Sequence, residues 1–511
     1  MAFDSRFNPE DLRQFLQSKY GSGVQVEVFP KAQQNATDEG QDPAARRRHK
    51  LEFNYRPSQI KEYLDRYVIQ QDDAKKVLAT AVCDHYHHIQ NCQSREDCLD
   101  YKKQNIILIG PTGVGKTYLI QNIARLIGVP FVKADATKYS ETGYVGGDVE
   151  DLIRELVSQA DGDIQLAEYG IVYLDEIDKI ASPATQLGRD VSGHGVQRGL
   201  LKLMEETEVP LRSPTDFASQ IQAFMEFQTK GKVEKKTIST KHILFIVSGA
   251  FTGLTEIITK RLGSRQIGFM GERPSSDQEH FLLTRAKSVD FIDYGFEAEL
   301  VGRLPVVVHC NPLLMEDLFN ILRYSEGSLL KQYKRDFLAY GIDTYFTDEA
   351  MRAMAEKATQ EQTGARGLMT IGEKVFREYK YALPDHDVRE LVVTRELIDD
   401  PEEMLKKLLA APDMYHGRVL QFQLKKFEEK FSDKYGVEVS VTPEAAQLLS
   451  EKAEADNRDL GSYCEALFGD FEHGLNLLSK NSGNSHHFVI DPSVVQDPAG
   501  SLERWIKESY K

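Results

Sequence analysis

Continuous apolar runs alternate with amphipathic helical patterns through the middle of the chain. The runs NIILIG (105–110), IVYLDE (171–176) and HILFIVSG (242–249) are rich in β-branched residues and lack the alternation of a strand with one wet face. Such strands, separated by helices, are typical of a parallel sheet covered on both faces. We therefore expect an α/β large domain over residues 55–314.

Helical patterns dominate from about residue 315, which predicts a small, mostly helical α+β domain over 315–412. An internal repeat follows it. GIDTYFTDEAMRAMAEKA (341–358) and GVEVSVTPEAAQLLSEKA (436–453) match at an offset of 95 residues, and each is followed by a helix, a strand and an Asp-Pro pair. We interpret residues 413–511 as a degenerate second copy of the small domain.

Residues 1–54 contain one short helical pattern and then a polar, charged stretch without apolar period, which indicates an appendage on a linker. The total of 511 residues exceeds what one hydrophobic core supports, in agreement with several domains. No apolar run approaches the roughly 20 residues of a membrane span, and the first residues lack a secretory pattern. We expect a cytoplasmic protein without membrane contact.

The net charge of −16 argues against non-specific nucleic-acid binding, and no nucleic-acid partner is expected. The five cysteines form no CxxC pair, which favours unbridged thiols in a reducing compartment. The stretch CDHYHHIQNCQSREDC (83–98) could hold a metal, but its spacing differs from that of zinc sites. We favour a helix whose histidines lie on a solvated or interface face, and expect no zinc.

One strand leads directly into a phosphate-binding motif. NIILIGPTGVGKTYLI matches G-x-x-x-x-G-K-[ST], after a strand and at the start of a helix, which is the context the motif requires. Its backbone N–H groups and the helix N-terminus favour phosphate oxygens, Lys116 would reach the β- and γ-phosphates, and Thr117 would bind Mg²⁺. The predicted ATP-binding residues are Gly110, Pro111, Thr112, Gly113, Val114, Gly115, Lys116, Thr117 and Tyr118.

A second strand, in GIVYLDEIDKI, ends in Asp175 and Glu176. Beside the phosphate loop, Asp175 could orient Mg²⁺ through water and Glu176 could polarise the attacking water. Ser248 closes another strand and would lie near the nucleotide if the two strands are neighbours. Arg303 in GRLP and Arg366 in TGARGL could contact phosphate, although composition alone favours plain surface ion pairs for both.

Several longer blocks, in order, resemble the ClpX family of AAA+ protein unfoldases, which feed the ClpP peptidase. They include EYLDRYVIQQDDAKKVLATAVCDHY, SETGYVGGDVEDLIRELV, RDVSGHGVQRGLLKLME and GRLPVVV, and the likeness covers about residues 55–400. The resemblance implies an AAA+ P-loop NTPase fold and a homo-hexamer with ATP at its subunit interfaces. It also implies that Val68 and Ile69 line the adenine pocket.

The same resemblance assigns roles to further residues. Ser248 would be sensor 1, Arg303 the finger that reaches a neighbour's γ-phosphate, and Arg366 sensor 2. Two loops would contact proteins: the pore loop would grip unfolded substrate proteins in the axial channel, and a docking loop would insert into ClpP. The pore-loop residues are Gly143, Tyr144, Val145 and Gly146, and the docking residues are Ile267, Gly268 and Phe269.

The chain also departs from the family pattern. It lacks the N-terminal four-cysteine zinc domain and the Arg-Lys-His pore-entry loop, and it reads YVIQQ and GYVGGD where YVIGQ and GYVGED are usual. The repeated tail has no family counterpart, so we expect it to be a scaffold or a module for an unidentified partner. The function predicted is ATP-dependent unfolding and threading of proteins, with delivery to ClpP; the alternatives are a ClpP-independent remodelling chaperone and a nucleotide-dependent binding switch.

Overall fold

A computed structural model describes residues 52–94, 102–139, 147–181, 193–211, 236–263, 281–386, 388–435, 438–456, 458, 460–469, 471 and 487–509. The predicted sheet is present: five strands pair in parallel in the order β2-β3-β6-β1-β7. These strands are β1 (Ile106–Ile109), β2 (Phe131–Asp135), β3 (Ile171–Asp175), β6 (Leu244–Gly249) and β7 (Val306–His309).

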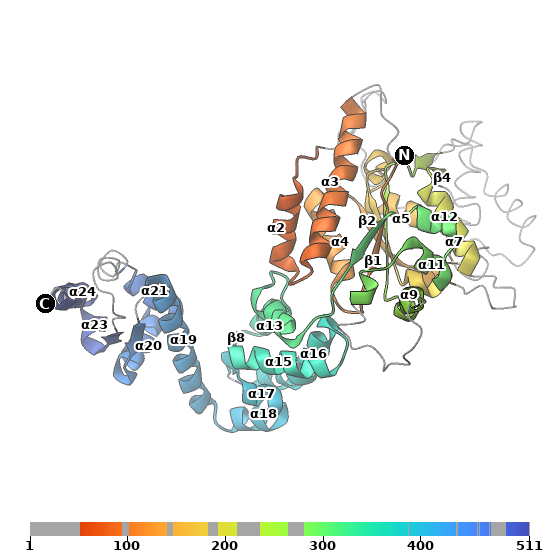
Figure 1. The fold of residues 1–511 in the computed structure, drawn as a ribbon. Coiled ribbons are helices and arrows are strands. Elements are labelled where there is room, and N and C mark those ends of the chain that lie inside the picture. Colours follow the sequence, from red (N-terminus) through yellow and green to blue (C-terminus); the bar gives the residue numbers. More distant parts are fainter. Residues whose placement is uncertain are drawn as a thin grey trace, which may run out of the picture. The chain divides into compact units, whose positions relative to one another are not determined.

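Successive residues of each strand enter different hydrophobic cores, as the period of two requires. Ile107 and Val247 pack in one core, and Leu108 and Ile246 pack in the other. Helices cover both faces of the sheet (Figure 1). One face carries α2 (Pro57–Tyr67), α3 (Asp72–Ser94) and α4 (Lys116–Ile127); the other carries α5 (Asp151–Gln159), α7 (Gly193–Met204), α9 (Leu254–Gly263), α11 (Ser288–Tyr294) and α12 (Ala298–Gly302). The expected α/β fold is confirmed.

Short elements complete this part of the chain. They are η2 (Ala136–Lys138), α6 (Ile164–Ala167), η3 (Ile177–Ile180) and the antiparallel pair β4 (Glu208–Pro210) and β5 (Thr237–Ser239).

The next segment is mostly helical and has its own core, as predicted. Its two short strands, β8 (Asp343–Phe346) and β9 (Glu390–Val393), pair in parallel. The helices are α13 (Met315–Tyr324), α14 (Leu329–Leu338), α15 (Asp348–Gln360), α16 (Ala365–Ala382), η4 (Leu383–Asp385), α17 (Arg395–Asp399) and α18 (Pro401–Ala410).

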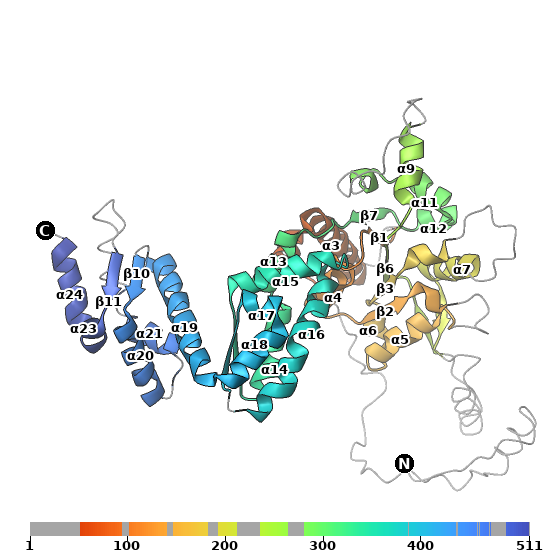
Figure 2. The ribbon, with the colours of Figure 1, turned by 90° about the horizontal axis from the view of Figure 1, so that it is seen from below.

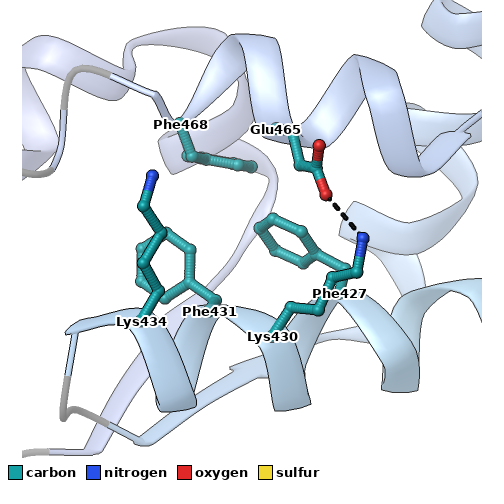
Figure 3. Close-up of a pocket in the computed structure, with 6 residues that line it drawn as sticks. All are labelled: Phe427, Lys430, Phe431, Lys434, Glu465 and Phe468. Carbon is teal, nitrogen blue, oxygen red and sulfur yellow. Dashed lines mark hydrogen bonds and ion pairs between the residues drawn. The ribbon is translucent and has the colours of Figure 1, made fainter. Parts of the chain in front are cut away.

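The last segment forms a further core around a second parallel pair, β10 (Glu438–Val441) and β11 (His487–Ile490). The pair lies between α19 (Pro412–Tyr435) on one side and α23 (Pro492–Gln496) and α24 (Pro498–Ser509) on the other (Figure 2). The remaining helices are α20 (Pro443–Ala455) and α21 (Leu460–Leu467). Figure 3 shows a pocket of about 480 Å³ between α19 and α21, where the rings of Phe427, Phe431 and Phe468 gather beside the ion pair of Lys430 with Glu465. No helix in the described ranges is both long and apolar enough to cross a membrane.

Candidate active site

The loop between β1 and α4 has the geometry of a phosphate cradle. Gly113 and Gly115 have φ of +76° and +97°, in the left-handed region that favours glycine. A Cβ at Gly113 would also lie 2.0 Å from the carbonyl oxygen of Thr363. Because the α4 N-cap is Gly115 and no side chain caps this end, the first-turn N–H groups are available to an anion.

Lys116 begins α4 and is folded into this loop. Its Nζ donates to the carbonyl oxygens of Gly110 (2.6 Å) and Pro111 (2.8 Å), and the residue is 8% exposed. Burial lowers the pKa of Lys116, while the carboxylate of Asp175 acts in the opposite direction. The ammonium is therefore held beside the cradle by contacts that phosphate oxygens would replace.

Asp175 accepts hydrogen bonds from two hydroxyl groups. Ser248 Oγ donates to Oδ1 at 2.6 Å, and Thr117 Oγ1 lies 3.4 Å from Oδ2. β3 and β6 are direct parallel neighbours, which places Ser248 beside Asp175 as the sequence predicted conditionally. The Thr117 hydroxyl and the Asp175 carboxylate fit Mg²⁺, which takes one or two protein oxygens and completes its shell with waters and phosphate.

The sequence analysis missed a fourth member of this network, Tyr173. Its phenol oxygen lies 2.7 Å from Ser248 Oγ and accepts from Thr117 Oγ1 at 3.2 Å. Burial raises the pKa of Tyr173, so the hydroxyl remains protonated. The signal was present in IVYLDE, because a tyrosine inside an otherwise aliphatic buried strand needs a polar partner.

Glu176 follows β3 and is exposed, with φ of 57° and ψ of 33°. A non-glycine residue in this conformation costs energy, and such strain clusters at functional sites. The next acid, Asp178, is buried and accepts from the backbone N–H of Phe251 at 3.2 Å, which ties the turn after β3 to the loop after β6. Glu176 is thus left facing solvent at the carboxyl edge of the sheet, where an attacking water could be polarised.

Val68 and Ile69 come directly after α2. Val68 is buried, and its Cγ1 would lie 3.9 Å from a Cβ at Gly115, so it lies next to the phosphate loop. Gln71 fixes this segment, since its side chain donates to the carbonyl of Asn311 (2.8 Å) and accepts from the N–H of Asn311 (2.7 Å). Gln70, which stands where the family usually has glycine, adopts φ of 59°. The departure therefore places a side chain in a conformation that favours glycine.

Arg366 lies in the first turn of α16 and is exposed. The preceding residue, Ala365, donates its N–H to the carbonyl of Gly113 at 2.9 Å. The positive charge of Arg366 also contributes to the lowered pKa of Lys116. The structure therefore places Arg366 next to the phosphate loop, on the side of the small domain.

Arg303 lies elsewhere. Its carbonyl accepts from Asn105 Nδ2 at 3.0 Å, and Asn105 directly precedes β1, whereas Gly110 directly follows it. The four residues of β1 separate Asn105 from Gly110 by five residue steps, about 16 Å at roughly 3.3 Å per residue. The Arg303 guanidinium pairs with Glu205 at 2.6 Å. Arg303 is thus anchored at the sheet edge opposite its own phosphate loop.

Two predicted loops lie outside the described residues: Gly143, Tyr144, Val145 and Gly146 in one, and Ile267, Gly268 and Phe269 in the other.

Residues 83–94 are helical, as the sequence predicted. The prediction that the histidines of this helix lie on a solvated or interface face was wrong for His85. That residue is buried, and its Nε2 lies 3.0 Å from the carbonyl of His242. Cys83, Cys310 and Cys464 are free, but Cys92 is disulfide-bonded, so the expectation of unbridged thiols was wrong for Cys92.

Comparison with known proteins decides the family. Residues 101–307 match the model of the AAA domain (Cdc48 subfamily). Two proteins named "ATP-dependent Clp protease ATP-binding subunit ClpX", from Borrelia duttonii (strain Ly) and Borrelia recurrentis (strain A1), are each 40% identical over 347 residues. The aligned region covers 67% of this chain and 78% of each relative.

The chain belongs to the ClpX family. It is therefore an AAA+ ATPase that couples ATP hydrolysis to protein unfolding, and the resemblance predicted from sequence blocks is confirmed. The acids, hydroxyls and lysine gathered at the carboxyl edge of the sheet have the chemistry that Mg-ATP requires. Among the described residues, no group of three or more His, Cys, Asp and Glu side chains is placed to hold a metal ion.

Proposed function

We propose that the chain works as a homo-hexameric ring that threads substrate proteins through its axial pore and delivers them to ClpP. The observation that carries the ring is the position of Arg303. The carbonyl of this arginine is bound at the amino edge of the sheet, while Lys116, Asp175 and Ser248 belong to the carboxyl edge. An arginine so placed is too far from its own phosphate loop, which supports a role at the ATP site of a neighbouring subunit.

Within each site, Lys116 and the α4 N-terminus would hold the phosphates, and Thr117 and Asp175 would hold Mg²⁺, which neutralises charge on the phosphates. Glu176 would accept the proton of the attacking water. Ser248 would sense the γ-phosphate, and Arg366 would stabilise it from the small domain. Val68 and Ile69 would contact the adenine.

Hydrolysis would move the small domain through two attachments. One is the bond between Ala365 and Gly113 in the phosphate loop. The other joins the α13–α14 turn to α2, where Ser325 Oγ donates to the carbonyl of Tyr67 at 2.6 Å and Arg66 pairs with Glu326 at 2.7 Å. A change in the angle between these parts would drag Tyr144 and Val145 along the substrate. Ile267, Gly268 and Phe269 would anchor ClpP.

The test mixes two inactive subunits. Lys116→Ala loses its own ATP site but keeps the finger, and Arg303→Ala keeps its ATP site but loses the finger. Arg377→Ala, at an exposed arginine of α16, is the matched control and should keep full activity. ATPase activity and unfolding of a stable tagged reporter, with and without ClpP, are measured for each variant and for the mixture.

Mixing the two variants should restore part of the activity, because each complements the other across an interface. If the mixture stays as inactive as its parts, Arg303 does not act between subunits. Degradation that survives Phe269→Ala would refute docking through this loop while leaving the ring intact.

We further propose that residues 413–511 are the second copy of the small domain. Both segments contain a parallel strand pair, and equivalent bonds recur at offsets of 95 to 97 residues. Lys357 Nζ donates to the carbonyl of Ile398, and Lys452 Nζ donates to that of Val495. Asp400 caps α18, and Asp497 accepts from the N–H of Gly500 in α24. Chance similarity between charged helices would not reproduce these contacts.

A further inference from the structure

The two ends of the segment that contains the proposed pore-loop residues are bonded to each other. Tyr139 and Gly147 form an isolated parallel bridge, in which the Gly147 N–H donates to the carbonyl of Lys138 at 3.1 Å. A Cβ at Gly147 would lie 3.5 Å from the Tyr139 ring, so the ring packs against this backbone. The ends of residues 140–146 are therefore held together, and a force on Tyr144 would pass to the chain that follows Gly147.

Arg154 holds the residues that follow this bridge, 147–151, which we call the pore-loop base. The arginine lies in the first turn of α5, and its side chain is 12% exposed. Its guanidinium pairs with Asp151 at 2.6 Å and with Glu150 at 2.8 Å. Its Nε donates to the carbonyl of Pro210, the last residue of β4, at 3.1 Å. The rigid fork of N–H donors on arginine thus joins the pore-loop base to a separate strand.

The strand that Arg154 contacts is itself anchored. β4 pairs with β5, and the N–H of Thr207, directly before β4, donates to Thr240 Oγ1 at 2.9 Å. Two residues earlier stands Glu205, the partner of the Arg303 guanidinium. Arg154 therefore connects the pore-loop base with the strand that follows the partner of the proposed finger.

We propose that Arg154 is a positioning residue that couples ATP hydrolysis to movement of the pore loop, through its Nε bond to Pro210. The inference rests on the proposed function, in which the pore loop grips the substrate. When Arg303 exchanges Glu205 for the phosphate of a neighbouring subunit, β4 shifts, and Arg154 passes the shift to the pore-loop base. Without this bond ATP is still hydrolysed, but less of the movement reaches the substrate.

Two variants separate the bond to Pro210 from the ion pairs. Arg154→Gln keeps an N–H donor as many bonds from Cα as the arginine Nε, but it carries no charge. Arg154→Lys keeps a charge for the two acids, but it has a methylene group in place of Nε. Arg154→Ala loses both kinds of contact. Arg377→Ala is the matched control, since Arg377 is exposed and its ion pair with Glu373 lies within α16.

The assay measures ATP hydrolysis and unfolding of a stable tagged reporter by the full chain in the same reaction. The readout is the ATP consumed for each reporter unfolded. Arg154→Ala and Arg154→Lys should raise this ratio at least about threefold, whereas Arg154→Gln and Arg377→Ala should change it less than about 1.5-fold. A merely structural role would lower the melting temperature and both rates together, and would leave the ratio unchanged.

Tyr144→Ala is assayed beside these variants to test the proposed function separately. If it leaves unfolding intact, the pore-loop role fails, and the coupling role of Arg154 fails with it. If it abolishes unfolding while Arg154→Lys keeps the parent's ratio, or while Arg154→Gln loses as much coupling as Arg154→Lys, only the proposal for Arg154 is overturned. The comparison of Lys with Gln decides the matter even if Arg154→Ala fails to fold.

Discussion

Removal of one hydroxyl group, in Tyr173→Phe, tests whether the network around Asp175 sets the rate of hydrolysis. The ring stays in its buried place, and only the contacts at 2.7 Å to Ser248 and 3.2 Å to Thr117 are lost. Ser248 keeps its bond to Asp175 but loses the hydrogen bond that its Oγ accepts from Tyr173. One such hydrogen bond contributes about 0.5–1.5 kcal/mol net, so a loss near 1.4 kcal/mol lowers kcat about tenfold.

Tyr86→Phe is the matched control for this prediction. Tyr86 is equally buried, and its hydroxyl donates to the carbonyl of Tyr169 at 2.9 Å, outside the Asp175 network. Both variants should lose a similar amount of thermal stability, but only Tyr173→Phe should lose kcat and need more Mg²⁺ for half-maximal rate. Steady-state ATPase assays at saturating ATP, with a Mg²⁺ titration, measure this. An unchanged kcat in Tyr173→Phe, or an equal loss in Tyr86→Phe, would refute the reasoning.

Three further outcomes are expected. Gly113→Ala should weaken ATP binding at least about tenfold in a fluorescent-nucleotide titration, because its Cβ would meet the Thr363 carbonyl at a positive φ; unchanged affinity would contradict this. Thermal stability should fall as pH drops from about 6.5 toward 4, because burial lowers the pKa of His85 to about 3 and of His242 to about 4. The unfolded chain then binds protons that the folded chain does not, and His85→Gln should flatten the slope measured by pH-dependent melting. Tyr144→Ala should abolish reporter unfolding while ATPase activity persists, and intact unfolding would exclude a pore-gripping role.

The sequence was sufficient wherever one local pattern determines both the element and its neighbours. The three apolar runs became β1, β3 and β6, because uninterrupted β-branched stretches are stable only between two covering layers. The glycine pattern before Lys116 predicted the phosphate loop, because the positive φ angles of Gly113 and Gly115 favour glycine. Ser248 was predicted only on the condition that β3 and β6 are neighbours, and strand order is a property of the whole sheet.

The features that were missed depend on contacts between residues distant in sequence. Tyr173 meets Thr117, 56 residues away, and Ser248, 75 residues away. Arg303 forms an ion pair with Glu205, which lies 98 residues away in the sequence. His85 is buried because its helix packs near His242. The surrounding residues are mostly polar, so the sequence pattern did not predict this burial. Periodicity reports burial along one element, but it carries no information on which polar atoms meet inside the fold.

The positions of the two attachments explain how a chemical step can become a movement. The small domain touches the phosphate loop at Gly113, and its α13–α14 turn holds the end of α2 directly before Val68. These contacts flank the segments proposed for phosphate and adenine. Any rearrangement of the loop during hydrolysis therefore changes one attachment relative to the other. Because the small domain is well packed, a small displacement at Gly113 would rotate the whole domain about its attachment to α2 rather than cause a local adjustment.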